Sequence, residues 1–233
     1  MSLSVGARHA LIGPNGAGKT TLVSLVSGVL RADAGRIAIL GQDVTNASAR
    51  LRVKAGLART FQVNSLFPAL TVLENVLLAV SERNNASHRM LQAVMRRKEL
   101  VEDAMQHLES VKLTDVADRR LDSLAYGLQR LVELAIALSL APKILLLDEP
   151  AAGLPMADAS RLLDVIDRLP AAIAVLMIEH DMHVVRRFAR EVTVLASGCV
   201  LMHGAPNDVL SSPEVRRVYL GKDRQRQNGA RHA

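Results

Sequence analysis

The sequence predicts an α/β protein built on a largely parallel β-sheet. Short apolar runs alternate with segments of helical periodicity along most of the chain, as expected when each strand is followed by a helix. The runs are hydrophobic at successive positions, which is typical of strands covered on both faces. The chain has 233 residues, of which 49% are hydrophobic and 22% charged, so it is large enough to bury such a core.

The pattern also places the individual elements of this core. Helices are expected after Lys19 and from about Asp158, and strands at residues 10–12, 36–40, 144–147 and 171–178. Near the end, residues 192–196 and 199–203 flank Ser197-Gly198. Two β-rich segments around a two-residue turn with glycine predict a β-hairpin.

The pattern changes between residues 81 and 142, where helical periodicity continues without intervening strands. Apolar residues recur there at spacings of three and four: Leu91, Val94, Met95, Leu131, Leu134, Ala135 and Leu138. We interpret this block as an inserted helical subdomain. We therefore expect a core from residues 1–80 and 143–205, the helical subdomain at 81–142, and a C-terminal helical segment with a basic tail at 206–233.

Composition and charge exclude several classes of protein. The single cysteine, Cys199, rules out an internal disulfide and is expected to be a small buried hydrophobe. No run is long enough to span a bilayer, and the N-terminus lacks the order of a signal peptide. The net charge of +6 could attract nucleic acid or an anionic membrane, but much of it lies in residues 96–98 and 222–231, which we interpret as solvated. Aromatic residues make up only 2%, which argues against a nucleic-acid partner.

A glycine-rich segment, GPNGAGKT at residues 13–20, follows the first strand and precedes a helix. In that context the glycines let the backbone approach phosphates, the helix N-terminus faces the anion, and a lysine reaches the β and γ phosphates. The motif therefore predicts a nucleotide site with Mg²⁺ bound through Thr20. The expected binding residues are Gly13, Pro14, Asn15, Gly16, Ala17, Gly18, Lys19, Thr20 and Thr21.

The apolar run KILLL at residues 143–147 ends in two carboxylates, Asp148 and Glu149. A buried strand of this kind delivers Asp148 to Mg²⁺, while Glu149 can act as general base on the attacking water. The alternative is a strand that ends in a solvated acidic pair.

Three interpretations are open for His180, which lies in the segment IEHDMH. His180 and His183 have the spacing of a helical metal pair, but no further Cys or His cluster completes a ligand set. His180 could also cap a helix. We favour a histidine at a strand end that senses the γ-phosphate.

The segment SLAYGLQR at residues 123–130 precedes another apolar helix. A small, glycine-containing segment at a helix N-terminus presents N–H groups and a positive dipole end, which suits an anion. By itself the segment indicates only the start of a helix.

Taken in order, these motifs resemble those of the nucleotide-binding subunits of ABC transporters, over nearly the whole chain. The matching segments are GPNGAGKT, ARTFQ ending at Gln62, LAYG, ILLLDEP, AAGL at 151–154 and IEHD. LFPALTVLENV, the LAYG form of the signature, GAPNDVL and PEVRRVYLG are similar to segments of the LivG-type ATPases of branched-chain amino acid importers. The resemblance implies a RecA-like P-loop NTPase core with a helical subdomain.

The resemblance also implies partners and further roles. Two subunits, in a homodimer or a heterodimer, would enclose two ATP molecules. The signature residues Leu124, Ala125, Tyr126 and Gly127 of one subunit would cover the ATP held by Lys19 of the other. Glu149, His180 and Gln62 would act in catalysis, and Gln62 would also bind Mg²⁺ near the attacking water. The loop that follows Gln62 and runs through about Leu73 would touch membrane permease subunits. A solute-binding protein would deliver the solute to these subunits. The chain would therefore lie on the cytoplasmic face of the inner membrane.

The sequence departs from the family pattern at several positions. Ala125 replaces a serine that bonds the γ-phosphate in many relatives, although the LivG type commonly has alanine. Leu128 replaces a glutamine, and Pro155 stands where an Asn or Asp is expected at the contact between subunits. Residues 1–12 contain no aromatic residue to stack on adenine. From this we expect a late start or a missing portion, and a reduced ATP affinity.

The function expected from the resemblance is ATP hydrolysis that drives uptake of branched-chain amino acids. Uptake of urea or short-chain amides is the alternative with the same ATPase role. A soluble ABC-type ATPase in nucleic-acid repair or translation, and a non-catalytic truncated subunit, are alternatives of another class.

Overall fold

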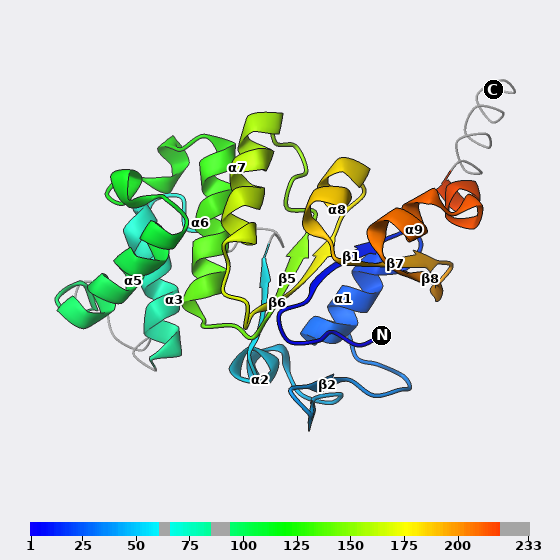
Figure 1. Cartoon of the computed structure of the whole chain (residues 1–233). Coiled ribbons are helices and arrows are strands. Elements are labelled where there is room, and N and C mark those ends of the chain that lie inside the picture. Colours follow the sequence, from blue (N-terminus) through cyan, green and yellow to red (C-terminus); the bar gives the residue numbers. More distant parts are fainter. Residues whose placement is uncertain (61–65, 85–93, 220–233) are drawn as a thin grey trace, which may run out of the picture.

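The computed structural model describes residues 1–60, 66–84 and 94–219, and it confirms the α/β fold (Figure 1). A 6-stranded sheet has the order β4-β5-β6-β1-β7-β8. Neighbouring strands from β4 to β7 run parallel, and β8 is antiparallel to β7. The strands are β1 (Arg8–Ile12), β4 (Leu57–Thr60), β5 (Ile144–Asp148), β6 (Ala174–Ile178), β7 (Glu191–Ala196) and β8 (Cys199–Gly204).

Helices cover both faces of this sheet because alternate side chains of each strand point to opposite faces. On β5, Leu146 belongs to the same buried cluster as Val23 of α1 (Lys19–Ser27). Leu145 and Leu147 belong to a different cluster, which contains Leu131 of α6. That second face carries α6 (Tyr126–Ser139), α7 (Met156–Asp167) and α8 (Met182–Phe188), and beside them α9 (Pro206–Ser211) packs on α8, β7 and β8.

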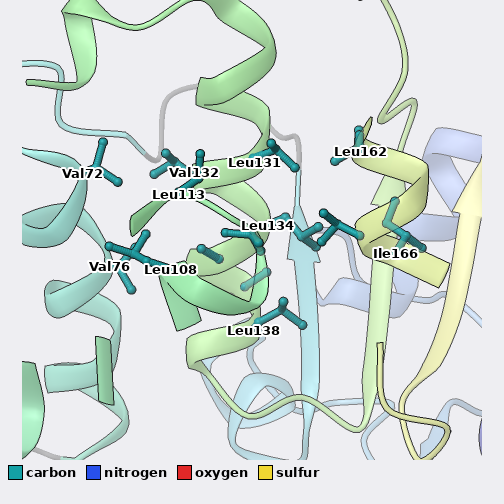
Figure 2. Packing of buried hydrophobic residues seen from close by; sticks show 14 of the residues in the cluster. Val72, Val76, Leu108, Leu113, Leu131, Val132, Leu134, Leu138, Leu162 and Ile166 are labelled. Atoms are coloured by element: carbon teal, nitrogen blue, oxygen red, sulfur yellow. The ribbon is translucent and has the colours of Figure 1, made fainter. Parts of the chain in front are cut away.

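A group of helices packs beside the β4 edge of the sheet. It contains α3 (Val72–Arg83), α5 (Lys98–Ser110) and α6, each in contact with the other two, with the short helices η1 (Thr114–Val116) and η2 (Leu121–Ser123) attached. Thr71 and Glu74 form a capping box that starts α3. Figure 2 shows the buried side chains that join this group to α7: Val72, Val76, Leu108, Leu113, Leu131, Val132, Leu134, Leu138, Leu162 and Ile166.

These helices include most of the block that the sequence assigns to a helical subdomain. Val94 is buried and Met95 is exposed, whereas Leu91 lies outside the described residues. The packing group starts with α3, before residue 81. The division into 1–80 with 143–205, 81–142 and 206–233 stays a prediction.

Several elements differ from the expected ones. The run at 36–40 contributes only β2 (Ala38–Ile39), which pairs with β3 (Gln42–Asp43) in a separate two-stranded sheet, followed by α2 (Ala49–Lys54). The edge strand β4 was not predicted, because an arginine and a threonine interrupt its apolar pattern. The strand expected at 171–178 begins only at Ala174, and the helix expected from Asp158 begins at Met156.

The hairpin β7–β8 is confirmed, with its turn at Ser197-Gly198. The prediction for Cys199 was wrong, since this residue is exposed at the start of β8. It lies on an edge strand that no further strand covers among the described residues. In the part of the chain described, every helix is too short or too polar to cross a bilayer.

Candidate functional site

The glycine-rich loop connects the end of β1 to α1, as the sequence predicted. Gly13 has φ 156°, and a Cβ atom on it would lie 2.3 Å from the carbonyl oxygen of Leu195. Gly18 is the N-cap of α1 in the left-handed conformation, with φ 99°. Because other residues rarely adopt these conformations, the glycines define the path of the loop.

The first turn of α1 fits an anion. No side chain caps this helix and no acidic residue lies in its first turn, which includes the exposed Thr20 and Thr21. The backbone N–H groups of the turn, which lack intrahelical partners, therefore face outward with the positive end of the helix dipole. This is the arrangement that binds phosphate.

Lys19 is held over the loop. Its side chain is buried, and Nζ donates to the carbonyl oxygens of Gly13 at 2.7 Å and Pro14 at 3.2 Å. The hairpin turn braces the same loop, because the N–H of Gly198 donates to the carbonyl oxygen of Ala17 at 2.9 Å. No local motif predicts this second contact, because it joins segments far apart along the chain.

Asp148 and Glu149 follow β5 at its carboxyl end, beside β6. Asp148 pairs with Ile178 in the sheet register, and Glu149 has φ 50° and donates its backbone N–H to Ile178 at 2.9 Å. The side chain of Glu149 is half exposed, with Oε1 3.7 Å from Nδ1 of His180. The structure therefore brings together two of the three side chains predicted to act in catalysis.

Arg59 was not singled out from the sequence, yet it reaches this site from β4. Its Nη2 donates to Oδ2 of Asp148 at 2.8 Å, and the two side chains are 9% and 18% exposed. A buried arginine is costly without an anionic partner. Nothing in the local sequence shows this pairing, because it depends on the register between β4 and β5.

Glu179 is a second residue of this site that has no role predicted from the sequence. It is buried, and its carboxylate oxygens accept hydrogen bonds from the N–H groups of Ala151 and His180, each at 3.2 Å. Burial raises the pKa of the Glu179 carboxyl, while these N–H groups act to lower it. Glu179 thus ties the loop after β5 to the residue after β6. The only signal in the sequence was its place next to His180.

The structure bears on two of the three interpretations of His180, as a helix cap and as a metal ligand. Asp181, not a histidine, caps α8, since its side chain accepts the N–H of His183 at 2.7 Å. Among residues 1–60, 66–84 and 94–219, no three His, Cys, Asp or Glu side chains are grouped to hold a metal ion. The γ-phosphate role of His180 stays a prediction.

The signature segment forms the N-terminus of α6. Leu124 is buried, Ala125 is the N-cap without a side-chain hydrogen bond, and Tyr126 is exposed beneath the guanidinium of Arg130, 4.8 Å from the ring centroid. Gly127 is buried, and a Cβ atom on it would lie 2.7 Å from the carboxyl group of Asp158.

The two helix N-termini lie on opposite faces of the sheet. The loop before α1, with Asp148, Glu149 and His180, lies at the carboxyl ends of the adjacent strands β1, β5 and β6. The start of α6 lies on the other face, because α6 packs with Leu145 and Leu147 whereas α1 packs with Leu146 (Figure 1). The two segments therefore do not form one site within a chain. Gln62 lies outside the described residues.

Oxygen donors suited to Mg²⁺ are available on the phosphate-loop side. Mg²⁺ prefers carboxylate, hydroxyl and phosphate oxygens. The carboxylate of Asp148 ends β5, next to the phosphate-loop side of the sheet, and the hydroxyl of Thr20 lies in the first turn of α1. This donor chemistry fits a metal ion bound together with a nucleotide.

Comparison with known proteins agrees with this geometry. Residues 1–152 match the family model described as "ABC transporter". A probable branched-chain amino acid transport ATP-binding protein LivG of Archaeoglobus fulgidus is 36% identical over 93% of this chain and 85% of its own length. The high-affinity branched-chain amino acid transport ATP-binding protein BraF of Pseudomonas aeruginosa is 36% identical over 91% of this chain and 86% of its own.

Solved structures give the same result. A nucleotide-free ATP-binding cassette from an ABC transporter superposes with a TM-score of 0.83 at 33% identity, covering 94% of this chain and 90% of that one. An ADP conformation of an ATP-binding cassette superposes with a TM-score of 0.82 at 33% identity, covering 95% and 90%. With its phosphate loop, its paired carboxylates and these relatives, the chain belongs to the ABC transporter family, as an ATP-binding cassette of the LivG type.

Proposed function

We propose that this chain is the ATP-hydrolysing subunit of an importer for branched-chain amino acids. The observation that carries the proposal is the placement of Asp148, Glu149 and His180 at the ends of β5 and β6, on the same edge of the sheet as the phosphate loop. A binding module without catalysis needs the loop but has no use for a half-exposed carboxylate next to a histidine at that point.

Each side chain then has a chemical role. Lys19 and the N–H groups of the first turn of α1 bind the phosphates. Asp148 and Thr20, with Gln62, would hold Mg²⁺, which when bound neutralises charge on the phosphate oxygens. Glu149 orients the attacking water and accepts its proton, and His180 contacts the γ-phosphate.

A second subunit completes the site. The signature residues at the start of α6 cannot reach the phosphates of their own chain, because the sheet separates them. In a homodimer or a heterodimer with another cassette, Leu124 to Gly127 of one subunit would cover the ATP of the other. The first turn of α6 has no side-chain cap, and the positive end of its helix dipole suits that anion.

The transported solute and the membrane partners are inferred from relatives. The named relatives are branched-chain amino acid transport proteins, which supports that solute over urea or short-chain amides. Membrane permease subunits would recruit the chain to the cytoplasmic face of the membrane, through the loop that ends near Leu73. A solute-binding protein would deliver the solute to them.

Substituting Glu149→Gln tests the catalytic assignment. The amide cannot accept the proton from water, so turnover should fall roughly 100-fold or more while ATP binding persists. ATP hydrolysis and calorimetric binding are measured, with Glu102→Gln on the exposed face of α5 as the control. In cells, the same variant should stop leucine uptake and leave urea uptake unchanged. Undiminished turnover would refute the catalytic role, and loss of urea uptake alone would refute the solute.

A further inference from the structure

Arg59 forms an ion pair with Asp148, the carboxylate that the proposed function assigns to Mg²⁺. Arg59 Nη2 donates to Asp148 Oδ2 at 2.8 Å, as a single hydrogen bond to one of the two carboxylate oxygens. Its Nη1 makes a weaker contact with Ser27 Oγ, at 3.4 Å, at the end of α1. Its Nε is buried and has no hydrogen-bond partner among the described residues. Asp148 is therefore the principal partner of this guanidinium.

The sheet determines this pairing. In the parallel register, Arg59 lies opposite Leu146, and Asp148 is two residues further along β5 on the same face. Leu146 packs on the α1 face, so both charged side chains point toward the helix that carries the phosphate loop. An arginine at a neighbouring position of β4 would point to the other face.

The pair has consequences for a metal ion. The guanidinium of Arg59 is a cation, so Asp148 has a positive charge beside it. A divalent ion that binds the Asp148 carboxylate lies close to the positive charge of Arg59. Because both side chains are mostly buried, solvent and salt screen the repulsion between the ion and the arginine only weakly. Conversely, without metal the arginine neutralises the carboxylate of Asp148, for which the described residues offer no other side-chain partner.

We propose that Arg59 is the counter-ion of Asp148 in the metal-free state and lowers the affinity of the site for Mg²⁺. The inference rests on the proposed role of Asp148 in the metal site. Arg59 would be a positioning residue: it keeps the Asp148 carboxylate oriented between turnovers. By opposing Mg²⁺, it also favours release of the metal with the product nucleotide.

The test compares Arg59→Met with Arg59→Lys, which keeps the charge. ATP affinity is measured by calorimetry in EDTA and in excess Mg²⁺, with Glu149→Gln in every protein to prevent hydrolysis. The ratio of the two affinities measures the coupling between metal and nucleotide. Arg59→Met should raise this ratio about tenfold, and Arg59→Lys should leave it within about twofold of the unsubstituted protein. A ratio that is unchanged or lower in Arg59→Met would overturn the proposal.

Thermal unfolding separates this role from a purely structural one. Without metal and nucleotide, Arg59→Met should lower Tm by roughly 5 to 10 °C. Most of that loss should disappear in saturating MgATP, because the metal then neutralises Asp148. The control is Arg50→Met, which breaks an exposed ion pair with Glu82 and should change Tm little. An equal loss of Tm with and without MgATP would mean that Arg59 only joins two strands, and the proposal would fail.

Two further variants cover other outcomes. If Arg59→Met does not fold, Arg59→Gln, which keeps a hydrogen-bond donor without the charge, should also raise the affinity ratio.

Asp148→Asn tests the proposed function on which this inference rests. It should reduce the ratio toward one, and an unchanged ratio would show that Asp148 does not hold the metal. A reduced ratio in Asp148→Asn without a rise in Arg59→Met would overturn only the role of Arg59.

Discussion

The phosphate loop and the signature segment both begin a helix without a side-chain cap, but they do so by different means. Before α1, Gly13 and Gly18 have positive φ values, and the loop contacts both the hairpin turn and the backbone of Leu195. Before α6, Ala125 has ordinary extended geometry. Glycine is needed at position 127 because a side chain would collide with Asp158, and not because the backbone there has an unusual conformation.

This difference separates the two halves of the proposed composite site. The phosphate loop owes its shape to its own glycines and to contacts with Leu195 and the hairpin turn of the same chain. The signature segment owes its shape to packing against the start of α7. We therefore expect substitutions in the loop to reduce both stability and binding, and substitutions in the signature to reduce mainly turnover.

The largest effect is expected from Gly13→Ala. The new Cβ atom would collide with the backbone carbonyl of Leu195, so the free energy of unfolding should fall by about 3 kcal/mol and ATP binding should be lost. The control is Gly16→Ala. Gly16 also has a positive φ, but a Cβ atom there would meet no atom within 4 Å, so this variant should lower the free energy of unfolding by only about 1 kcal/mol. Denaturant unfolding and calorimetry measure both. Equal effects at the two positions would show that the contact with Leu195 is unimportant.

Gly127→Ala should have a smaller effect on stability and a different effect on function. Its Cβ atom meets the Asp158 side chain, which can move in part, so we expect a loss of about 1.5 kcal/mol. ATP binding to the isolated chain should persist while turnover falls. Replacing Asp158 by Ala in the same protein should restore the lost stability. Loss of ATP binding by the single variant would contradict the separation of the two segments.

Ala125→Ser should have the smallest effect, and a favourable one. The backbone of Ala125 already has N-cap geometry, and a serine oxygen there can accept an N–H of the first turn of α6. We expect a gain of about 1 kcal/mol in the free energy of unfolding. Ala159→Ser, inside α7, is the control and should cost a few tenths of that amount. No gain would indicate that the N-terminus of α6 already has its partners.

Much of the fold and half of the site could be predicted from local sequence. The loop, Lys19, the strand ending in Asp148 and Glu149, and the hairpin all lie where their motifs indicated. The strand that carries Arg59 was missed, since its LART sequence lacks the continuous apolar pattern of the central strands. The role of Glu179 could not be predicted, because the N–H group of Ala151 that it binds is distant in sequence.

By itself, the sequence determined the phosphate loop and the acidic pair, because glycine conformations and buried strands are properties of a few consecutive residues. Only the tertiary structure decided which side chains surround them. Strand register brings Arg59 to Asp148, and the alternation of side chains across the sheet places α1 and α6 on opposite faces. Contacts of this kind join residues far apart along the chain, and their energy depends on a geometry that no single segment contains.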